Sequence, residues 1–250
     1  MKQLYHKKLT KPYVLSRTRI ENFLKCPRCF YLQEKYGINP PSLPGFSLNS
    51  AVDELLKKEF DRHRAQGTPH PLMKKYGIAA IPAPHKELEL WRNNFKGIRV
   101  IHQPTNFELF GALDDLWINQ NNEYYVVDYK ATATNKEISL EDEYKQNYKL
   151  QAEFYQWLLR QRGLKVSDIA YFIFCNGKKD KETFNGRLEF ELTILEHKGD
   201  TSWVEPTLMK IKECLNSEEI PPPSEKCELC QYVKAEKFYT YKKASLPKIF

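Results

Sequence analysis

Two strand-like segments joined by an asparagine-rich turn place the strongest constraint on how this chain can fold. The segments span 107–119 and 123–131, and the residues between them read Gln-Asn-Asn. Valine, isoleucine, tyrosine and tryptophan favour strands, and asparagine favours the tight turns of hairpins. Because the turn sets the register of a hairpin, a three-residue turn places Asn119 opposite Glu123. The pattern therefore predicts an antiparallel hairpin with a defined register.

This register brings two acidic side chains face to face. Counting back from the turn, Asp114 lies directly opposite Asp128, and Lys130 projects from the same face two residues further along. Directly opposed carboxylates repel each other unless a cation lies between them. The hairpin therefore predicts a metal site.

Carboxylates and a lysine are also the groups that metal-dependent hydrolysis of a phosphodiester requires. Asp114 and Asp128 supply hard oxygen ligands for Mg²⁺ or Mn²⁺, and the backbone carbonyl of Tyr129 could add another. Lys130 can orient the attacking water or stabilise the anionic transition state. The alternative is that Asp114 and Asp115 are solvated acids and that Asp128 forms a surface ion pair with Lys130.

The rest of the chain has the periodicity of a mixed α/β protein. Apolar residues at helical spacing predict helices over 16–32, 49–64, 88–95, 142–161 and 203–216. Strand-like runs occupy 97–102, 169–175 and 188–195, whereas the Pro- and Gly-rich stretch 67–84 is expected to be irregular. This order predicts one α/β domain over 1–250, with a mixed central β-sheet flanked by helices, whose core sheet and helix lie within 98–195.

Four of the six cysteines form Cys-x-x-Cys pairs near the two ends of the chain: Cys26, Cys29, Cys227 and Cys230. The pairs fall within 16–32 and 220–234. In a reducing compartment such cysteines are more often metal or cluster ligands than disulfides. They therefore predict a four-cysteine site that joins the N- and C-terminal segments. Cys175 and Cys214 lie in apolar patterns and are expected to be small buried hydrophobic residues.

The composition is that of an ordinary globular protein, with 41% hydrophobic and 13% aromatic residues. A formal net charge of +7 suits a polyanionic partner, and nucleic acid is favoured over a membrane surface. No apolar run approaches the roughly 18 residues that span a bilayer, and the first residues lack the apolar core of a secretory signal. A cytoplasmic location is therefore expected.

Three short motifs follow one another along the chain: Gly111-x-x-Asp114, Asp128-x-Lys130 and, on the long helix, Gln151-x-x-x-Tyr155. In this order and at these distances they resemble the PD-(D/E)XK nuclease superfamily, and within it the RecB-like branch that includes the CRISPR-associated exonucleases. The resemblance covers residues 16–230. It implies a restriction-endonuclease-like core and a metal-dependent DNA nuclease that acts in DNA repair, recombination or defence.

The resemblance also implies a role for each matching residue. Asp114 and Asp128 would bind the catalytic Mg²⁺ or Mn²⁺, and Lys130 would be the catalytic lysine. Gln151 and Tyr155 would contact nucleic acid or support the site. The alternative is a catalytically inactive nucleic-acid-binding or scaffold protein that keeps the nuclease fold and the cysteine site.

The family implies a further metal ligand from an upstream helix, where close relatives carry a Gly-x-x-x-His pattern. The matching segment is Asn49-Ser-Ala-Val-Asp53, which places Asp53 at the histidine position. A carboxylate can replace the imidazole and favours harder metal ions. Glu54 would take this role if the register shifted by one residue. The alternative is that Asp53, three residues after Ser50, only stabilises the start of the helix.

Two cofactors suit the four cysteines. Relatives with an iron–sulfur cluster usually present one cysteine early and three late, whereas this chain has two early and two late. Four thiolates can hold either a [4Fe-4S] cluster or Zn²⁺. The family context favours the cluster, and structural Zn²⁺ is the alternative. Either would close a loop of about 200 residues.

The segment 234–243 interleaves lysines with aromatic residues. This mixture suits phosphate neutralisation and base stacking on a single-stranded nucleic acid, and it suits an ordinary amphipathic helix slightly better. The expected partner is DNA, with a single strand as one option and RNA as another. Whether the protein acts alone or beside a helicase, repair or integration partner stays open.

Overall fold

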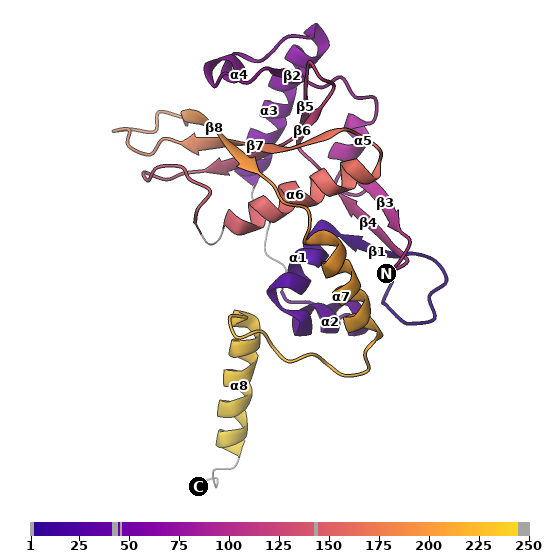
Figure 1. Ribbon diagram of the computed structural model, residues 1–250. Coiled ribbons are helices and arrows are strands. Elements are labelled where there is room, and N and C mark those ends of the chain that lie inside the picture. The colour runs from indigo at the N-terminus through magenta and orange to yellow at the C-terminus, as the bar shows by residue number, and fades with distance from the viewer. Residues whose placement is uncertain (1–2, 42–44, 46, 143–144, 245–250) are drawn as a thin grey trace. The chain divides into compact units, whose positions relative to one another are not determined.

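Two compact units make up the chain in the computed structural model, which describes residues 3–41, 45, 47–142 and 145–244, with the backbone alone for 241–244 (Figure 1). The first unit combines Met1–Leu43, Gln103–Phe107 and Glu205–Phe250. The second unit combines Pro44–His102 and Glu108–Val204. The paired cysteines belong to the first unit and the motif residues to the second, so each site lies within one unit.

The second unit is built around a five-stranded sheet in the order β2-β5-β6-β7-β8. These strands are β2 (Ala80–Pro82), β5 (Asp115–Asn119), β6 (Tyr124–Thr132), β7 (Val166–Gly177) and β8 (Phe190–Lys198). β6 and β7 are parallel, whereas the other neighbours are antiparallel. Parallel neighbours need a crossover connection, which here contains α6 (Gln146–Gln161). The predicted mixed central sheet is confirmed.

The predicted register of the hairpin is also confirmed. Ile118 pairs with Tyr124, and the Asn119 N–H donates to the carbonyl of Glu123 over 3.1 Å. Asn122 takes a left-handed conformation with φ of 54°, which asparagine tolerates better than most residues. The asparagine-rich turn therefore sets how β5 pairs with β6.

The continuous strand predicted over 107–119 is wrong. It is interrupted at residues 112–114, and its first part is a separate strand, β4 (Phe107–Gly111). β4 is the neighbour of β3 (Ile98–His102) in another, smaller sheet. The break is important for function because it contains Asp114, whose side chain lies at the start of β5 instead of inside a regular ladder.

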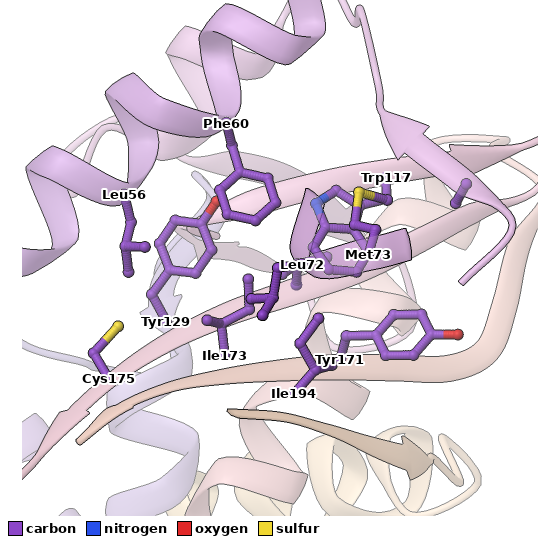
Figure 2. Packing of buried hydrophobic residues seen from close by; sticks show 12 residues of the cluster. Leu56, Phe60, Leu72, Met73, Trp117, Tyr129, Tyr171, Ile173, Cys175 and Ile194 are labelled. Atoms are coloured by element: carbon purple, nitrogen blue, oxygen red, sulfur yellow. The ribbon is translucent and has the colours of Figure 1, made fainter. Parts of the chain in front are cut away.

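The core of the second unit lies between one face of the sheet and α3 (Ser47–Gln66), as Figure 2 shows. Phe60 of α3 stacks on Trp117 with ring centroids 5.6 Å apart and also packs near Tyr129. Alternate residues of a strand point to opposite faces. Tyr129 therefore points toward α3, while Asp128 and Lys130 point toward α6 on the other face.

Two other predictions for this unit need correction. The stretch 67–84 is not irregular, since it contains α4 (Pro71–Lys75) and the edge strand β2. α4 contributes the buried Leu72 and Met73 to the core, so its apolar residues explain why it folds. α5 (Leu88–Arg92) and β3 agree with the predicted short helix and strand. The helix predicted from Asp142 begins at Gln146, and 143–144 lie outside the described residues.

The first unit contains β1 (Tyr13–Ser16), α1 (Arg17–Lys25), α2 (Pro27–Tyr36), α7 (Val204–Asn216) and α8 (Glu228–Ala244). The single helix predicted over 16–32 is wrong, because Cys26 is extended and Pro27 starts a new helix. Proline lacks the N–H that would continue α1, but it suits the first position of α2. Among the described residues, no helix combines the length and apolar character that a membrane crossing needs.

Candidate functional site

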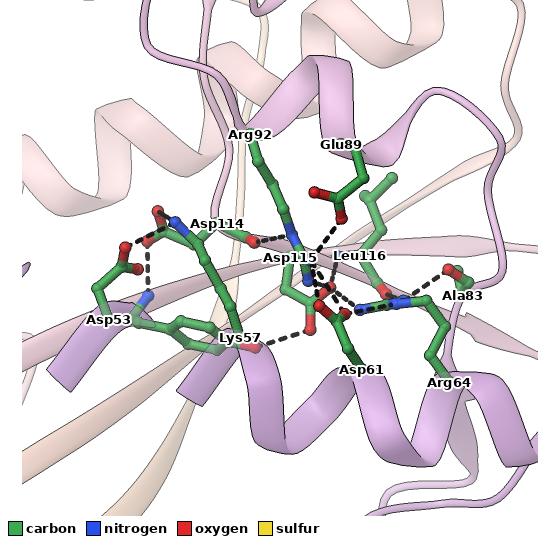
Figure 3. Close-up of polar contacts among 11 residues, drawn as sticks. Asp53, Lys57, Asp61, Arg64, Ala83, Glu89, Arg92, Asp114, Asp115 and Leu116 are labelled. Atoms are coloured by element: carbon green, nitrogen blue, oxygen red, sulfur yellow. Dashed lines mark hydrogen bonds and ion pairs between the residues drawn. The ribbon is translucent and has the colours of Figure 1, made fainter. Parts of the chain in front are cut away.

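Two carboxylates of the second unit share one lysine (Figure 3). Lys57 follows Asp53 by one turn of α3, and its Nζ lies 2.7 Å from Asp53 Oδ2. The same Nζ lies 3.6 Å from Asp114 Oδ1. The break before β5 thus places Asp114 beside the helix that carries Asp53, with an ammonium group between the two side chains.

Asp114 is held through both its side chain and its backbone. The backbone N–H of Tyr129 donates to Asp114 Oδ2 over 2.9 Å. Arg92 Nε donates to the Asp114 carbonyl over the same distance. These bonds leave Asp114 Oδ1 directed toward Lys57. The orientation of this carboxylate is therefore fixed by groups from β6 and α5.

Asp53, and not Glu54, lies beside Asp114. Burial and the neighbouring Asp114 carboxylate raise the pKa of Asp53 above its ordinary value. The Glu54 side chain is exposed and pairs with Lys58, away from Asp53. The alternative that Asp53 only stabilises the start of the helix is wrong, because α3 begins at Ser47, six residues before Asp53. The register that the sequence pattern suggested is therefore the one that meets the other carboxylate.

Asp128 and Lys130 form an ion pair in the interior, not on the surface. The side chain of Asp128 is 1% exposed and that of Lys130 is 16% exposed. Burial alone would lower the pKa of Lys130, but Asp128 and Asp114 outweigh it and raise this pKa above its ordinary value. The ammonium of Lys130 therefore stays charged and belongs to the same electrostatic site as Asp114.

Side chains of α6 hold Lys130 from the other direction. Lys130 Nζ donates to Gln151 Oε1 over 3.2 Å and lies 4.5 Å from the centre of the Tyr148 ring. Gln151 Nε2 in turn donates to the hydroxyl oxygen of Tyr155 over 3.2 Å. The Gln-x-x-x-Tyr motif thus reaches the lysine as a chain of hydrogen bonds.

The glycine of the first motif makes room for the tyrosine of the third. A Cβ atom at Gly111 would lie 2.5 Å from Cε1 and 3.2 Å from Cδ1 of Tyr155. The Tyr155 ring itself is buried, at 3% exposure. Two motifs that are far apart in the sequence are therefore coupled by direct packing.

Behind these carboxylates lies a buried network centred on Asp115 (Figure 3). Asp115 is fully buried, pairs with Arg64 and Arg92, and accepts a hydrogen bond of 2.7 Å from the Tyr129 hydroxyl. Burial and the Asp115 carboxylate raise the pKa of Tyr129 well above its ordinary value. The alternative of a solvated Asp115 is wrong, because this buried residue connects β5 to β6 and to the two arginines.

Sequence reasoning missed three residues of this site. Lys57 had a usable signal, because it follows Asp53 by four residues and thus shares its face of a helix. Arg92 had none, since it reaches Asp114 from a separate short helix. Tyr148 lies on the helix predicted over 142–161, and its ring contacts the ammonium of Lys130.

The donor chemistry of the aspartates suits a hard divalent cation. Asp53, Asp114 and Asp128 offer carboxylate oxygens, which Mg²⁺ and Mn²⁺ prefer. The ammonium of Lys57 already occupies a cation position between the first two. The three carboxylates do not meet as closely as the cysteines described next, so a shared ion would require the side chains to rearrange.

The four paired cysteines come together in the first unit. Their Sγ atoms are 3.9 Å apart for Cys26 and Cys230, 3.6 Å for Cys29 and Cys227, and 3.4 Å for Cys29 and Cys230. Within the part of the chain that the structure describes, they are the one group of three or more possible metal ligands whose ligand atoms all lie within 4.8 Å of one another. The predicted junction of the N- and C-terminal segments is confirmed.

Each cysteine pair begins a helix. The Cys26 carbonyl accepts from the Phe30 N–H over 3.1 Å, and the Cys227 carbonyl accepts from the Gln231 N–H over 3.0 Å. The first cysteine of each pair is thus the residue before the helix, and the second lies in its first turn. Helix N-termini stabilise negative charge, which favours thiolates.

The pKa values of these thiols are spread apart. Burial opposes ionisation of Cys26, but backbone hydrogen bonds from Ser224 and Cys29 outweigh it and lower its pKa to about 6. Burial and the adjacent sulfur atoms raise the pKa of Cys29. The cluster therefore favours one thiolate even without a metal. Outside it, Cys175 is buried as predicted, whereas Cys214 is only partly buried.

Comparison with known proteins adds a family context to both sites. A family model described as the PD-(D/E)XK nuclease superfamily matches residues 14–235. Seven chains of solved structures match this chain. A crystal structure of SSO0001 shares 13% sequence identity, with 86% of this chain and 82% of the other covered and a TM-score of 0.40. The search of curated proteins gave no significant match.

Proposed function

Because the chain belongs to the PD-(D/E)XK nuclease superfamily, we propose that it is a RecB-like, metal-dependent nuclease that hydrolyses phosphodiester bonds of DNA. The observation that carries this proposal is the buried pair of Asp128 and Lys130 beside Asp114. Such hydrolysis needs carboxylates for a divalent cation and a fixed positive charge near the phosphate. The net charge of +7 supports a polyanionic substrate.

In this proposal Asp53, Asp114 and Asp128 hold Mg²⁺ or Mn²⁺, and the carbonyl of Tyr129 is a further ligand. The bound ion would supply Lewis-acid polarisation of the phosphate and a more acidic water. The chain's own contribution is the orientation of the ligands. Asp114 is fixed by the Tyr129 N–H and by Arg92, so little reorganisation of this residue is needed.

Lys130 acts as a cation and not as a base. Asp128 and Asp114 raise the pKa of Lys130 above its ordinary value, which favours its protonated form before a metal binds. A charged group held by Gln151 can orient the attacking water and stabilise the negative charge that grows on the phosphate. Tyr155 supports this arrangement through Gln151.

We also propose that both units act as one nuclease domain over 1–250. The family model spans residues of both units, which supports this assignment. The region 98–195 carries the motifs at Gly111, Asp128 and Gln151. The core sheet extends beyond this region, to β2 at Ala80–Pro82 and to Lys198 at the end of β8. The segments 16–32 and 220–234 carry the cysteine pairs and supply a structural metal site.

The spacing of the sulfur atoms bears on which cofactor they hold. Four thiolates about 2.3 Å from one tetrahedral ion lie about 3.8 Å from one another. Three of the six separations are 3.4, 3.6 and 3.9 Å, and all six are within 4.8 Å, which is close to that value. A four-iron cluster is larger than a single ion and needs more widely separated sulfurs. We therefore favour structural Zn²⁺ over the [4Fe-4S] cluster that the family context suggested.

Metal-dependent cleavage of DNA by matched variants tests the proposed activity. Wild type, Lys130→Ala and Lys181→Ala would be incubated with single- and double-stranded DNA in Mg²⁺, in Mn²⁺ and in EDTA. Lys181 is exposed on the segment between β7 and β8, so its variant controls for the loss of one positive charge. We expect cleavage by wild type and Lys181→Ala in metal only, and a loss of at least 100-fold in Lys130→Ala (about 10²–10³ for one transition-state contact).

The same experiment distinguishes the proposed nuclease from the alternative, an inactive protein. A wild-type protein that binds DNA but cleaves none in either metal would be an inactive nucleic-acid-binding or scaffold protein. Equal cleavage by Lys130→Ala would show that the lysine assignment is wrong. Parallel reactions with RNA define the substrate class.

The resemblance suggests DNA repair, recombination or defence as the biological setting, beside a helicase, repair or integration partner. The aromatic and basic α8 supports single-stranded DNA as the form that is bound. Exposed aromatic rings can stack on unpaired bases, whereas paired bases are not available in this way.

A further inference from the structure

Lys57 stands out because the proposed activity does not use it, although it contacts two of the proposed metal ligands. Its Nζ lies 2.7 Å from Asp53 Oδ2 and 3.6 Å from Asp114 Oδ1. We infer that Lys57 is an internal counter-ion that competes with the divalent cation for these carboxylates and, once displaced, binds the substrate phosphate. The inference rests on the proposed function, since it concerns the same metal site.

The charges of the site support competition. Among the three proposed ligands and the two lysines beside them, Asp53, Asp114 and Asp128 contribute three negative charges and Lys57 and Lys130 two positive ones, so these five side chains carry a net charge of −1. Arg92 is paired with Asp61 and Asp115 behind them. Without Lys57 the net charge would be −2. A divalent cation is attracted more strongly to the second arrangement. Lys57 therefore keeps metal binding weak while no substrate is present.

The position of Lys57 allows its side chain to move without disturbing the fold. The neighbouring Leu56 and the following Phe60 are buried against the sheet and anchor this part of α3. The Lys57 side chain is 19% exposed, so part of it already faces solvent. A lysine carries its charge on a flexible four-carbon stem. The helix can therefore stay in place while the charge leaves the carboxylates.

A displaced Lys57 would give the substrate a reason to bind together with the metal. Its ammonium would lie at the edge of the site, where a phosphodiester approaches the carboxylate-bound ion. Metal and substrate would each favour the same position of the lysine. Such coupling is reciprocal, so substrate must tighten metal binding by the factor by which metal tightens substrate binding.

Lys57 also has a matched control one residue further along the helix. Lys58 has the same chemistry and lies on the same helix, but its side chain is 64% exposed and pairs with Glu54. Lys57→Met and Lys58→Met each remove one positive charge and keep most of the apolar stem. A general effect of net charge would act on both variants alike.

Free Mn²⁺ measured by electron paramagnetic resonance gives the test, with full-length protein and no nucleic acid. We expect Lys57→Met to bind Mn²⁺ about 3- to 10-fold more tightly than wild type, as expected for the loss of one competing, partly buried charge. Lys58→Met and Lys57→Arg should bind like wild type. Addition of a cleavage-resistant phosphorothioate single strand should tighten Mn²⁺ binding by wild type and much less by Lys57→Met.

The outcomes separate this inference from the proposed function. If wild type binds no Mn²⁺, or if Asp114→Asn leaves Mn²⁺ binding unchanged, the proposed metal site itself is wrong. If that site binds Mn²⁺ but Lys57→Met matches Lys58→Met or binds more weakly, the counter-ion role of Lys57 is overturned. Circular dichroism checks that each variant is folded, and Lys57→Gln replaces Lys57→Met if the latter does not fold.

Discussion

Gly111 couples two motifs through the absence of a single Cβ atom. An alanine there would bring its Cβ to 2.5 Å from the buried ring of Tyr155. Because the ring has little room to move, we expect Gly111→Ala to lower the free energy of unfolding by about 1–3 kcal/mol, the usual range for overpacking a core. Chemical denaturation would measure the change.

Gly45 provides the control for this substitution. A Cβ atom at Gly45 would meet no atom within 4 Å, so Gly45→Ala should change stability by no more than about 0.5 kcal/mol. Equal stability of Gly111→Ala and wild type would show that Tyr155 can shift freely, and the packing explanation for the glycine would then be rejected.

The buried network around Asp115 is predicted to be important for stability. Asp115→Asn removes the buried charge that two partly buried arginines share. Breaking a buried ion pair by removing one partner typically costs about 3–5 kcal/mol, and we expect a loss of this order in thermal or chemical unfolding. Asp180→Asn, on an exposed segment, should leave stability unchanged. A loss in Asp115→Asn no larger than in this control would mean that the network is not important for stability.

The sequence predicts some residues of the site better than others. The register of β5 and β6 follows from the turn, because a turn of known length determines which residues face each other. The ladder begins with Asp115 opposite Val127, so the break before β5 takes Asp114 out of the direct pairing with Asp128 that the sequence predicts. Arg92 does not follow, because its contact with Asp114 depends on how a short helix packs against the sheet. Periodic patterns report local geometry, whereas contacts between distant elements depend on the whole fold.

At the scale of elements, one helical and one strand segment are interrupted in the structure where the sequence pattern is continuous. The predicted strand over 107–119 and the predicted helix over 16–32 each combine two elements. Hydrophobic periodicity continues across both breaks and therefore gave no warning. Pro27 was a signal for the second break, since proline cannot continue a helix. The first break has no such marker apart from Gly111.

The exposed aromatic residues of α8 are predicted to bind single-stranded DNA. Tyr232, Phe238 and Tyr239 are all more than half exposed, and lysines lie between them. Their replacement by serine should weaken binding of single-stranded DNA, because stacking contributes about 1–3 kcal/mol per base. Fluorescence anisotropy with a labelled single strand, in EDTA to prevent cleavage, measures the loss.

An exposed aromatic residue elsewhere makes the control for α8. Phe95→Ser removes a ring that is 85% exposed but lies outside this helix, and it should not change the affinity. If the α8 variant binds DNA as well as wild type but is less stable, the helix instead uses its aromatic residues for packing. That outcome would support the ordinary amphipathic helix that the sequence also suggested.

At the scale of the whole chain, the order of elements was enough to predict the fold class. Helix, hairpin, long helix and further strands predict a mixed sheet, because parallel neighbours need a long crossover connection and α6 supplies one between β6 and β7. The division into two compact units did not follow from the sequence. The first unit is assembled from three separate segments, and no local pattern shows that these segments meet.

A metal at the four-cysteine site, as proposed above, would cross-link the outermost of these segments. Cys29 and Cys227 are 198 residues apart in the chain. By analogy with a disulfide, which stabilises by about 4–5 kcal/mol when it closes a loop of such length, we expect a large loss of stability without the metal. The double variant Cys26→Ser, Cys230→Ser should melt at a lower temperature than wild type. Prolonged chelation should lower the melting temperature of wild type in the same way. Cys214→Ser is the control, because this cysteine belongs to the same unit but not to the cluster.

The identity of the metal can be determined in the same samples. Protein purified without oxygen should be colourless and contain one Zn²⁺ per chain if the close sulfur spacing reflects a single tetrahedral ion. A brown protein whose visible absorbance is bleached by oxidation would instead contain an iron–sulfur cluster, and the preference for Zn²⁺ would be wrong. A wild-type melting temperature that chelation leaves unchanged would mean that the cysteines do not hold the terminal segments together through a metal at all.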